Sequence, residues 1–202
     1  NDKLKKVAVG GGPPVSLCTA TNMKGGTWNE DGVILFAPDH QSGIHRVSAT
    51  GGDPEPVTVL PDSSNQDSHR HPRFLPDGRR FLFLARGAKS TDSVLMIGSL
   101  DRDEPREVMR SDTQAELVSG HLLSVREGTL MAQRIDPSTV TLVGAPIALA
   151  EDVMVLPGAA VSVFSASRNG LLTYQTGFSE LPMALEWRDR SGALLGTFGE
   201  PA

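Results

Sequence analysis

The protein has 202 residues, of which 39% are apolar, and a formal net charge of −5. This length and composition allow a sizeable core. Glycine (21 residues) and proline (14 residues) both exceed average usage, which favours many short strands and turns over long helices. The basic residues are scattered, and nucleic-acid-binding surfaces require clustered Lys and Arg, so we expect no nucleic-acid partner.

The longest apolar segment, residues 145–164, is interrupted by Glu151, Asp152 and Pro157. We therefore expect no membrane-spanning helix within the sequence. Cys18 is the single cysteine, which excludes an internal disulfide and leaves the redox compartment open. The sequence has no signal-peptide pattern and no initiator Met, so we expect it to be an excerpt of a longer chain.

The first predicted element is a hairpin, formed by residues 5–9 and 14–18 around the turn Gly10-Gly11-Gly12-Pro13. A phosphate-binding loop is the alternative for these glycines. Pro13 and Pro14 lack the backbone donors that such a loop needs, and no Lys-Ser/Thr pair follows. The sequence therefore favours a hairpin turn.

A strand–turn–strand pattern then recurs along the chain, and its clearest copy is Pro76-Asp77-Gly78 between two apolar segments. Glycine adopts positive φ without a Cβ clash, and an aspartate can bond the turn backbone, so this pattern predicts a tight hairpin. Trp28 and Phe74 each lie four residues before a turn glycine, and we expect both to pack between sheets. The copies turn at Asp31-Gly32, Pro76-Asp77-Gly78, Gly120 and Asn169-Gly170.

Each copy is accompanied by further short apolar segments that predict additional strands. The first repeat has predicted strands at residues 27–28, 33–37, 43–47 and 56–60. The second has them at residues 71–75, 80–85, 94–100 and 106–109. The third has a clear hairpin at residues 122–126 and 129–135, and the fourth has strands at residues 161–165, 171–174, 185–189 and 193–198.

The turn glycines are residues 32, 78, 120 and 170, so successive copies are 46, 42 and 50 residues apart. Repeats of this length with several short strands are typical of propeller blades. We therefore predict an all-β fold, a β-propeller segment with about four four-stranded blades. The predicted blades are residues 25–62, 68–110, 113–152 and 158–199, and residues 1–20 would be the last two strands of a preceding blade. The total blade number is open, and we expect further blades outside the sequence.

The turn Pro76-Asp77-Gly78, followed by an apolar strand, resembles the WD40-like (PD40) propeller repeats of TolB-type proteins. More narrowly, residues 68–78 (SHRHPRFLPDG) and 125–133 (VREGTLMAQ) resemble the propeller region of bacterial eukaryotic-like serine/threonine protein kinases, C-terminal to their transmembrane segment. The third repeat departs from the consensus, and the turns at Gly32 and Gly170 lack the proline. The resemblance implies a periplasmic or extracytoplasmic domain that senses or binds a protein or small-molecule ligand.

His69 and His71 lie two residues apart on a predicted extended segment, where their imidazoles would share one face. Such a pair could contact a metal or an anion. A zinc site needs three or four ligands, and the remaining histidines lie in other repeats, so we expect no metal site and no cofactor. Because the first strand of a blade lies near the central channel, we predict that a ligand at the channel mouth contacts His69, Arg70 or His71.

Catalytic patterns are absent from the sequence. There is no Gly-x-Ser-x-Gly motif, and His69-Arg70 is followed by His71, where a kinase catalytic loop has Asp. We therefore expect a non-catalytic segment, with any catalytic domain outside it. Two alternatives remain: a propeller that gates substrate access in a peptidase or other hydrolase, and a periplasmic TolB-like interaction protein. The identity of the ligand and the oligomeric state are left open.

Overall fold

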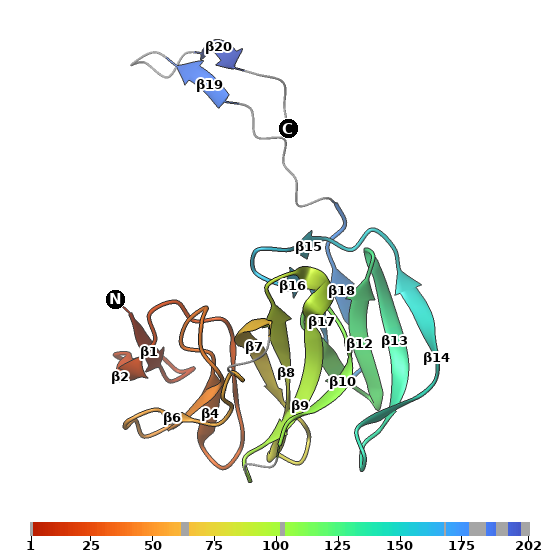
Figure 1. Cartoon of the computed structure of the whole chain (residues 1–202). Coiled ribbons are helices and arrows are strands. Elements are labelled where there is room, and N and C mark those ends of the chain that lie inside the picture. Colours follow the sequence, from red (N-terminus) through yellow and green to blue (C-terminus); the bar gives the residue numbers. More distant parts are fainter. Residues whose placement is uncertain are drawn as a thin grey trace.

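A computed structural model of the chain describes residues 2–61, 65–101, 104–167, 169–177, 185–188 and 194–198. The described residues form β-strands and one short 3₁₀ helix, η1 (Ser90–Asp92) (Figure 1). None of the described helical structure is long and apolar enough to cross a membrane. The chain is an all-β fold, as predicted.

Three four-stranded antiparallel sheets follow one another along the chain, and we call each sheet a blade (Figure 1). Consecutive strands are neighbours within every blade. Blade 1 contains β3 (Gly26–Trp28), β4 (Val33–Phe36), β5 (His45–Ser48) and β6 (Glu55–Pro56). Blade 2 contains β7 (Gln66–Phe74), β8 (Arg80–Gly87), β9 (Val94–Ser99) and β10 (Arg106–Arg110). Blade 3 contains β11 (Glu116–Val118), β12 (His121–Arg126), β13 (Thr129–Asp136) and β14 (Thr141–Ala150).

Two-stranded sheets flank the blades. The predicted N-terminal hairpin is formed by β1 (Lys3–Lys6) and β2 (Val15–Thr19). The fourth repeat, predicted as one four-stranded blade, is divided into separate pairs in its described residues. These pairs are β15 (Val155–Leu156) with β16 (Val161–Ser162), β17 (Phe164–Ala166) with β18 (Leu172–Tyr174), and β19 (Leu185–Arg188) with β20 (Leu194–Phe198).

The division of the fourth repeat begins at Val163, between β16 and β17. Its backbone N–H donates to the carbonyl of Met154, and its carbonyl accepts from Gln175. The first part of segment 161–166 therefore pairs with β15, which precedes it, and the second part pairs with β18, which follows it. The predicted strand ends Asp189 and Ala193, and the predicted unit ends at residues 1, 62 and 199, lie outside the described residues.

The turn chemistry agrees with the sequence prediction. Gly32, Gly78, Gly120 and Gly170 have φ values of 77°, 67°, 75° and 87°, the positive region in which glycine has no Cβ penalty. In the turn between β7 and β8, the carboxylate of Asp77 accepts hydrogen bonds from two backbone N–H groups two and three residues later, each at 2.9 Å. The hairpin at Gly78 is therefore confirmed.

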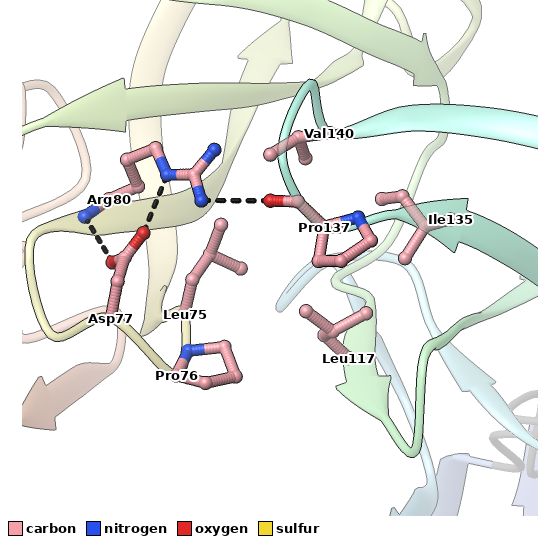
Figure 2. A pocket seen from close by; sticks show the side chains of 8 residues that line it. All are labelled: Leu75, Pro76, Asp77, Arg80, Leu117, Ile135, Pro137 and Val140. Carbon is pink, nitrogen blue, oxygen red and sulfur yellow. Dashed lines mark hydrogen bonds and ion pairs between the residues drawn. The ribbon is translucent and has the colours of Figure 1, made fainter.

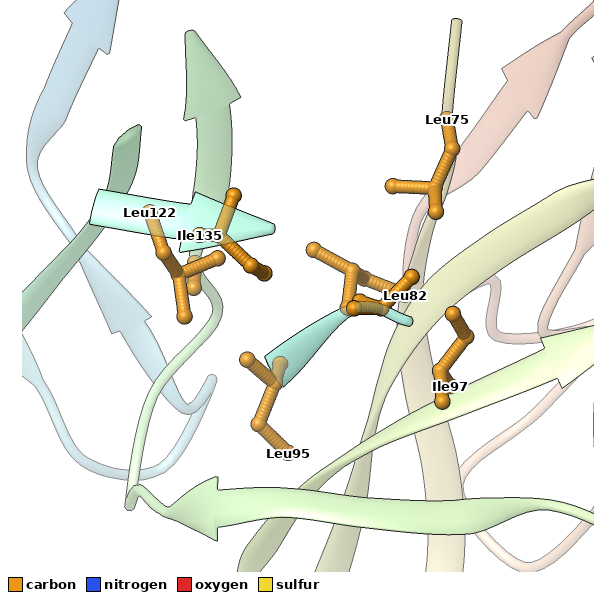
Figure 3. Close-up of a cluster of buried hydrophobic side chains, with 8 residues drawn as sticks. Leu75, Leu82, Leu95, Ile97, Leu122 and Ile135 are labelled. Atoms are coloured by element: carbon orange, nitrogen blue, oxygen red, sulfur yellow. The ribbon is translucent and has the colours of Figure 1, made fainter. Parts of the chain in front are cut away.

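Strand β8 is buried on both of its faces, which the continuous apolar sequence predicted. Alternate side chains of the strand pack against different blades. Phe81, Phe83 and Ala85 belong to a cluster with blade 1 residues such as Leu35. Leu82 lies in the opposite cluster, between blades 2 and 3 (Figure 3). The residues of this second cluster that Figure 3 labels are Leu75, Leu82, Leu95, Ile97, Leu122 and Ile135.

The two aromatic residues expected between sheets differ in their environment. Phe74 packs against the cluster between blades 1 and 2, as predicted. Trp28 is 54% exposed, so its predicted burial is wrong. Trp28 pairs with Ile34 and therefore lies on the face of blade 1 that is covered by β1 and β2. That two-stranded sheet covers Ile34 and leaves Trp28 at the margin.

Candidate functional site

The three residues predicted to contact a ligand lie in the first half of β7, the edge strand of blade 2. Backbone N–H groups of this strand donate to loops of blade 1: His69 bonds the carbonyl of Ser42, and His71 bonds the carbonyl of Lys24. Side chains of the same strand contact residues 158 and 159 of the fourth repeat. The strand thus contacts two other repeats at this edge. We call His69, Arg70, His71 and the turn at residues 157–160 the inner-edge site.

His69 is 3% exposed and bonded through both ring nitrogens. Its Nε2 lies 3.2 Å from Gln66 Oε1 and its Nδ1 lies 2.7 Å from Thr58 Oγ1. An amide oxygen only accepts, so Nε2 carries the proton and the neutral ring accepts at Nδ1 from the Thr58 hydroxyl. The ring also packs on Phe83, with centroids 4.8 Å apart. Burial lowers the pKa of His69 from 6.5 to about 4, so the imidazole is neutral at pH 7.

His71 has a left-handed backbone, with φ of 53°, at a register shift between β7 and β8. This conformation interrupts the alternation of side chains along β7. Its Nε2 donates to the carbonyl of Ala159 at 2.9 Å, whereas the ring of His69 bonds Thr58 and Gln66. The backbone thus lacks the regular alternation from which a shared face was expected, and the two imidazoles bond different partners. Burial is the largest cause that lowers the pKa of His71.

Arg70 is 4% exposed, and its polar contacts are neutral. Its Nε donates to Ser68 Oγ at 2.8 Å, and its Nη1 donates to the carbonyl of Gly158 at 3.3 Å. Among the described residues, no carboxylate lies within 4.0 Å of its guanidinium. The neighbouring acid, Asp67, forms an ion pair with Arg86 and accepts a hydrogen bond from Ser68 at 3.0 Å. Burial lowers the pKa of Arg70, and the charge of Arg86 acts in the same direction.

The turn at residues 157–160 lies against Arg70 and His71. Two backbone hydrogen bonds close it, from Ala159 to Leu156 and from Ala160 to Pro157, both at 3.1 Å. Its far side is held by Gln114, whose side chain both donates to and accepts from the backbone of Ser162. The sequence did not predict these contacts, because the turn is 88 residues from its partners on β7.

The chemistry of the inner-edge site is that of a buried cation held by neutral acceptors. Its surroundings add positive charge, since Lys24, Arg73 and Arg70 all act to lower the pKa of His71. A guanidinium with unused N–H donors suits an anionic partner. Neither here nor elsewhere in the described residues are three His, Cys, Asp or Glu side chains grouped so that they could hold a metal ion.

The opposite end of β7 borders a cavity of about 200 Å³ between blades 2 and 3 (Figure 2). Its lining is mainly apolar, from Leu75, Pro76, Leu117, Ile135, Pro137 and Val140, with Asp77 and Arg80 at the edge. Figure 2 shows Arg80 directed to Asp77 and to a carbonyl of blade 3. The distances are 2.6 Å to Asp77 Oδ2 and 2.8 Å to the Pro137 oxygen. Arg80 thus has an acid partner, and Arg70 has none among the described residues.

No family model matches the sequence, and no curated protein matches it. Several solved structures are similar in fold. Regucalcin from Agrobacterium tumefaciens strain C58, a calcium-binding protein, matches 99% of this chain and 68% of its own, with a TM-score of 0.60 and 12% identity. TolB from Acinetobacter baumannii matches 95% of this chain and 47% of its own, with a TM-score of 0.58 and 16% identity.

Puromycin hydrolase matches 99% of this chain and 35% of its own, with a TM-score of 0.55 and 19% identity. The chain therefore spans less than half the length of both TolB and the hydrolase. At these identities the likeness shows the fold alone. The three consecutive four-stranded sheets and the propeller-type neighbours together show that the chain is an all-β propeller segment.

Proposed function

We propose that the chain is a non-catalytic propeller domain that binds a protein or small-molecule ligand at the inner-edge site. The observation that carries this proposal is Arg70, a buried arginine without an acid partner among the described residues. A buried charge costs free energy unless it is paired, so such a residue suggests a role beyond packing. The likeness to TolB supports an interaction domain.

A serine–histidine nucleophile pair finds no support at this site. The Ser68 hydroxyl donates to Asp67, and the adjacent His69 uses both ring nitrogens in other bonds. Ser68 therefore has no histidine to act as its general base. A non-catalytic role is the function that these contacts support best.

The finer proposal is that the domain is the extracytoplasmic sensor of a bacterial receptor-type serine/threonine kinase. Its support is the resemblance of residues 68–78 and 125–133 to the propeller region of such kinases. Determining the reading frame on both sides of the 202 codons tests it. An upstream kinase domain with one apolar helix is the expected result. A signal peptide alone would instead favour a periplasmic TolB-like protein.

A second candidate is the propeller of a larger hydrolase, where it would gate access of substrate. The observation that favours it is the match of this chain to 35% of puromycin hydrolase. A serine-hydrolase motif in the flanking reading frame would establish this candidate in place of the sensor.

Binding at the inner-edge site is tested by affinity capture with the purified chain, followed by mass spectrometry. The variant Arg70→Met/His71→Ala removes the polar contacts of the site, and Arg79→Met is a matched control at an exposed ion pair with Asp101. We expect the wild type and the control to recover the same ligand. The amount recovered by the double variant should be at least tenfold lower. Equal recovery by all three folded proteins would contradict the proposal, and turnover of aminoacyl anilides by the purified chain would contradict the non-catalytic role.

A further inference from the structure

The inner-edge site holds one buried cation, Arg70, and its charged neighbours are already paired or less buried. Asp67 is the acid close enough to affect the pKa of Arg70, and it already forms an ion pair with Arg86. Arg73 is also paired, with Glu116 at 2.6 Å. Lys24 donates to the neutral side chain of Asn22. The charge of Arg70 therefore remains without a counter-charge among the described residues.

The guanidinium of Arg70 has donors to spare. Arginine has five N–H groups, and the described contacts of Arg70 use one on Nε and one on Nη1. The Nη1 contact to Gly158 is long for a charge-assisted hydrogen bond, at 3.3 Å. Ser68 is the nearer acceptor, at 2.8 Å, and it is neutral. Neither acceptor compensates the charge.

We propose that Arg70 binds an oxyanion, a carboxylate or phosphate group of the ligand, beneath the turn at residues 157–160. This inference rests on the proposed function, because it names the chemical group that the inner-edge site recognises. Carboxylate and phosphate match the planar donors of a guanidinium and can accept two parallel hydrogen bonds. His71 supplies a further N–H donor, which now bonds the carbonyl of Ala159.

The turn at residues 157–160 covers Arg70 from the solvent side. Pro157 and Gly158 are exposed, although Arg70 beneath them is buried. A Cβ built on Gly158 would meet no atom within 4 Å, so the space on the Cβ side of this residue is open. An oxyanion that takes the place of the Gly158 carbonyl needs a shift of this turn, which is exposed at Gly158 and anchored at Ala160, a buried residue whose carbonyl accepts from the backbone of Gln114.

The test is thermal unfolding of the 202-residue chain in sodium acetate, inorganic phosphate or chloride at one ionic strength. A ligand at ten times its dissociation constant raises the Tm of a domain of this size by roughly 3 to 6 °C. We expect such a rise for the wild type in phosphate, acetate or both, relative to chloride. The anion that gives it distinguishes a phosphate ligand from a carboxylate ligand.

Phosphate also stabilises proteins in general, so the comparison between variants is decisive. Arg70→Met should lose at least half of the rise, whereas Arg79→Met should keep all of it. Equal rises in the three proteins, or no rise in the wild type, would overturn the oxyanion proposal. Affinity capture that still depends on Arg70 would then leave the proposed function standing with an uncharged ligand.

A second measurement tests the proposal on the wild-type protein alone, so it does not depend on whether Arg70→Met folds. In ¹H–¹⁵N spectra of the wild-type guanidinium groups, the Nε–H signal of Arg70 should shift saturably with added anion. The Nε–H signal of Arg79 should not shift in this way. A titration that leaves the signal of Arg70 unmoved would also overturn the proposal.

Discussion

The two ends of strand β7 are held in place in different ways. At the Gly78 end, the turn is closed by residues close in sequence: Gly78 bonds Leu75 through the backbone, and Asp77 bonds Arg79 and Arg80. At the other end, the strand is held by loops of blade 1 and by a turn of the fourth repeat. Tertiary contacts also reach the first end, from the Asn29 side chain to the Gly78 carbonyl at 2.8 Å and from Arg80 to the Pro137 carbonyl. The turn itself is closed by local sequence, whereas the second end is held mainly by tertiary contacts.

The difference affects what each end tolerates. A local turn needs one backbone conformation at one residue, and the chain around it remains free to adjust. An end held by several loops needs a close fit between segments that are distant in sequence, and close-packed groups respond strongly to added volume. We therefore expect substitutions at the inner edge to have larger effects than those at the turn.

The largest expected effect is at Gly43, beside the inner-edge site. A Cβ at this position would lie 2.0 Å from the carbonyl oxygen of Thr58, the residue whose side chain bonds His69. Because a backbone atom cannot move aside as a flexible side chain can, Gly43→Ala should cost more than about 3 kcal/mol. Urea unfolding measures this.

The matched control for Gly43→Ala is Gly10→Ala, where an added Cβ meets nothing within 4 Å. The control should change the free energy of unfolding by no more than about 1 kcal/mol. An equal effect of both substitutions would show that residue 43 does not pack against Thr58.

The second expected effect concerns pH and His69. Its pKa is about 4 in the folded chain and 6.5 in the unfolded chain, so below pH 6.5 the unfolded state takes up a proton that the folded state does not. The free energy of unfolding should therefore fall as the pH drops from about 6.5 to about 4. The loss attributable to His69 is up to about 3 kcal/mol, at roughly 1.4 kcal/mol per pH unit.

Denaturant unfolding between pH 7 and pH 4.5 measures this dependence. His69→Gln should flatten the curve, and His40→Gln, at an exposed position, should leave it as in the wild type. An unchanged pH dependence in His69→Gln would contradict the assignment of the effect to His69.

The smallest of these effects is expected at the local end, for Gly78→Val. Gly78 has φ of 67°, and the nearest atom to an added Cβ is the Asn29 Cβ at 3.8 Å, so backbone strain acts without a clash. The expected cost is about 2 kcal/mol, seen as a lower denaturant midpoint. Gly78→Asn should cost less, because asparagine tolerates positive φ. A denaturant midpoint unchanged by Gly78→Val would contradict the positive-φ turn assigned to residue 78.

The fold was predictable because its signals are local. Turn glycines such as Gly78 and the apolar strand after it can be recognised within a dozen residues, and their spacing gives the repeat length. The fourth repeat was harder to predict. Its division depends on pairing of Val163 with Met154 and Gln175, which the period of the sequence does not indicate.

The sequence predicted residues of the inner-edge site but not their contacts. The sequence indicated His69, Arg70 and His71 because they lead into the first strand of a predicted blade, which was expected near the central channel. It assumed regular alternation along β7, whereas the left-handed φ of His71 interrupts that alternation and its ring bonds a different partner from the ring of His69. Nothing in the local sequence indicates that Ala159 would be its partner. A non-glycine residue at positive φ is a tertiary effect, stabilised here by that distant contact.

The contacts from β7 to the turn at residues 157–160 also bear on how the protein unfolds. In an array where each repeat contacts only its neighbours, repeats can open one at a time. Here Arg70 and His71 join blade 2 to the fourth repeat, so blade 3 lies within a closed loop of 88 residues. Opening of blade 3 alone would strain the contacts between blade 2 and the fourth repeat. Blades 2 and 3 and the start of the fourth repeat are thus expected to unfold as one cooperative unit.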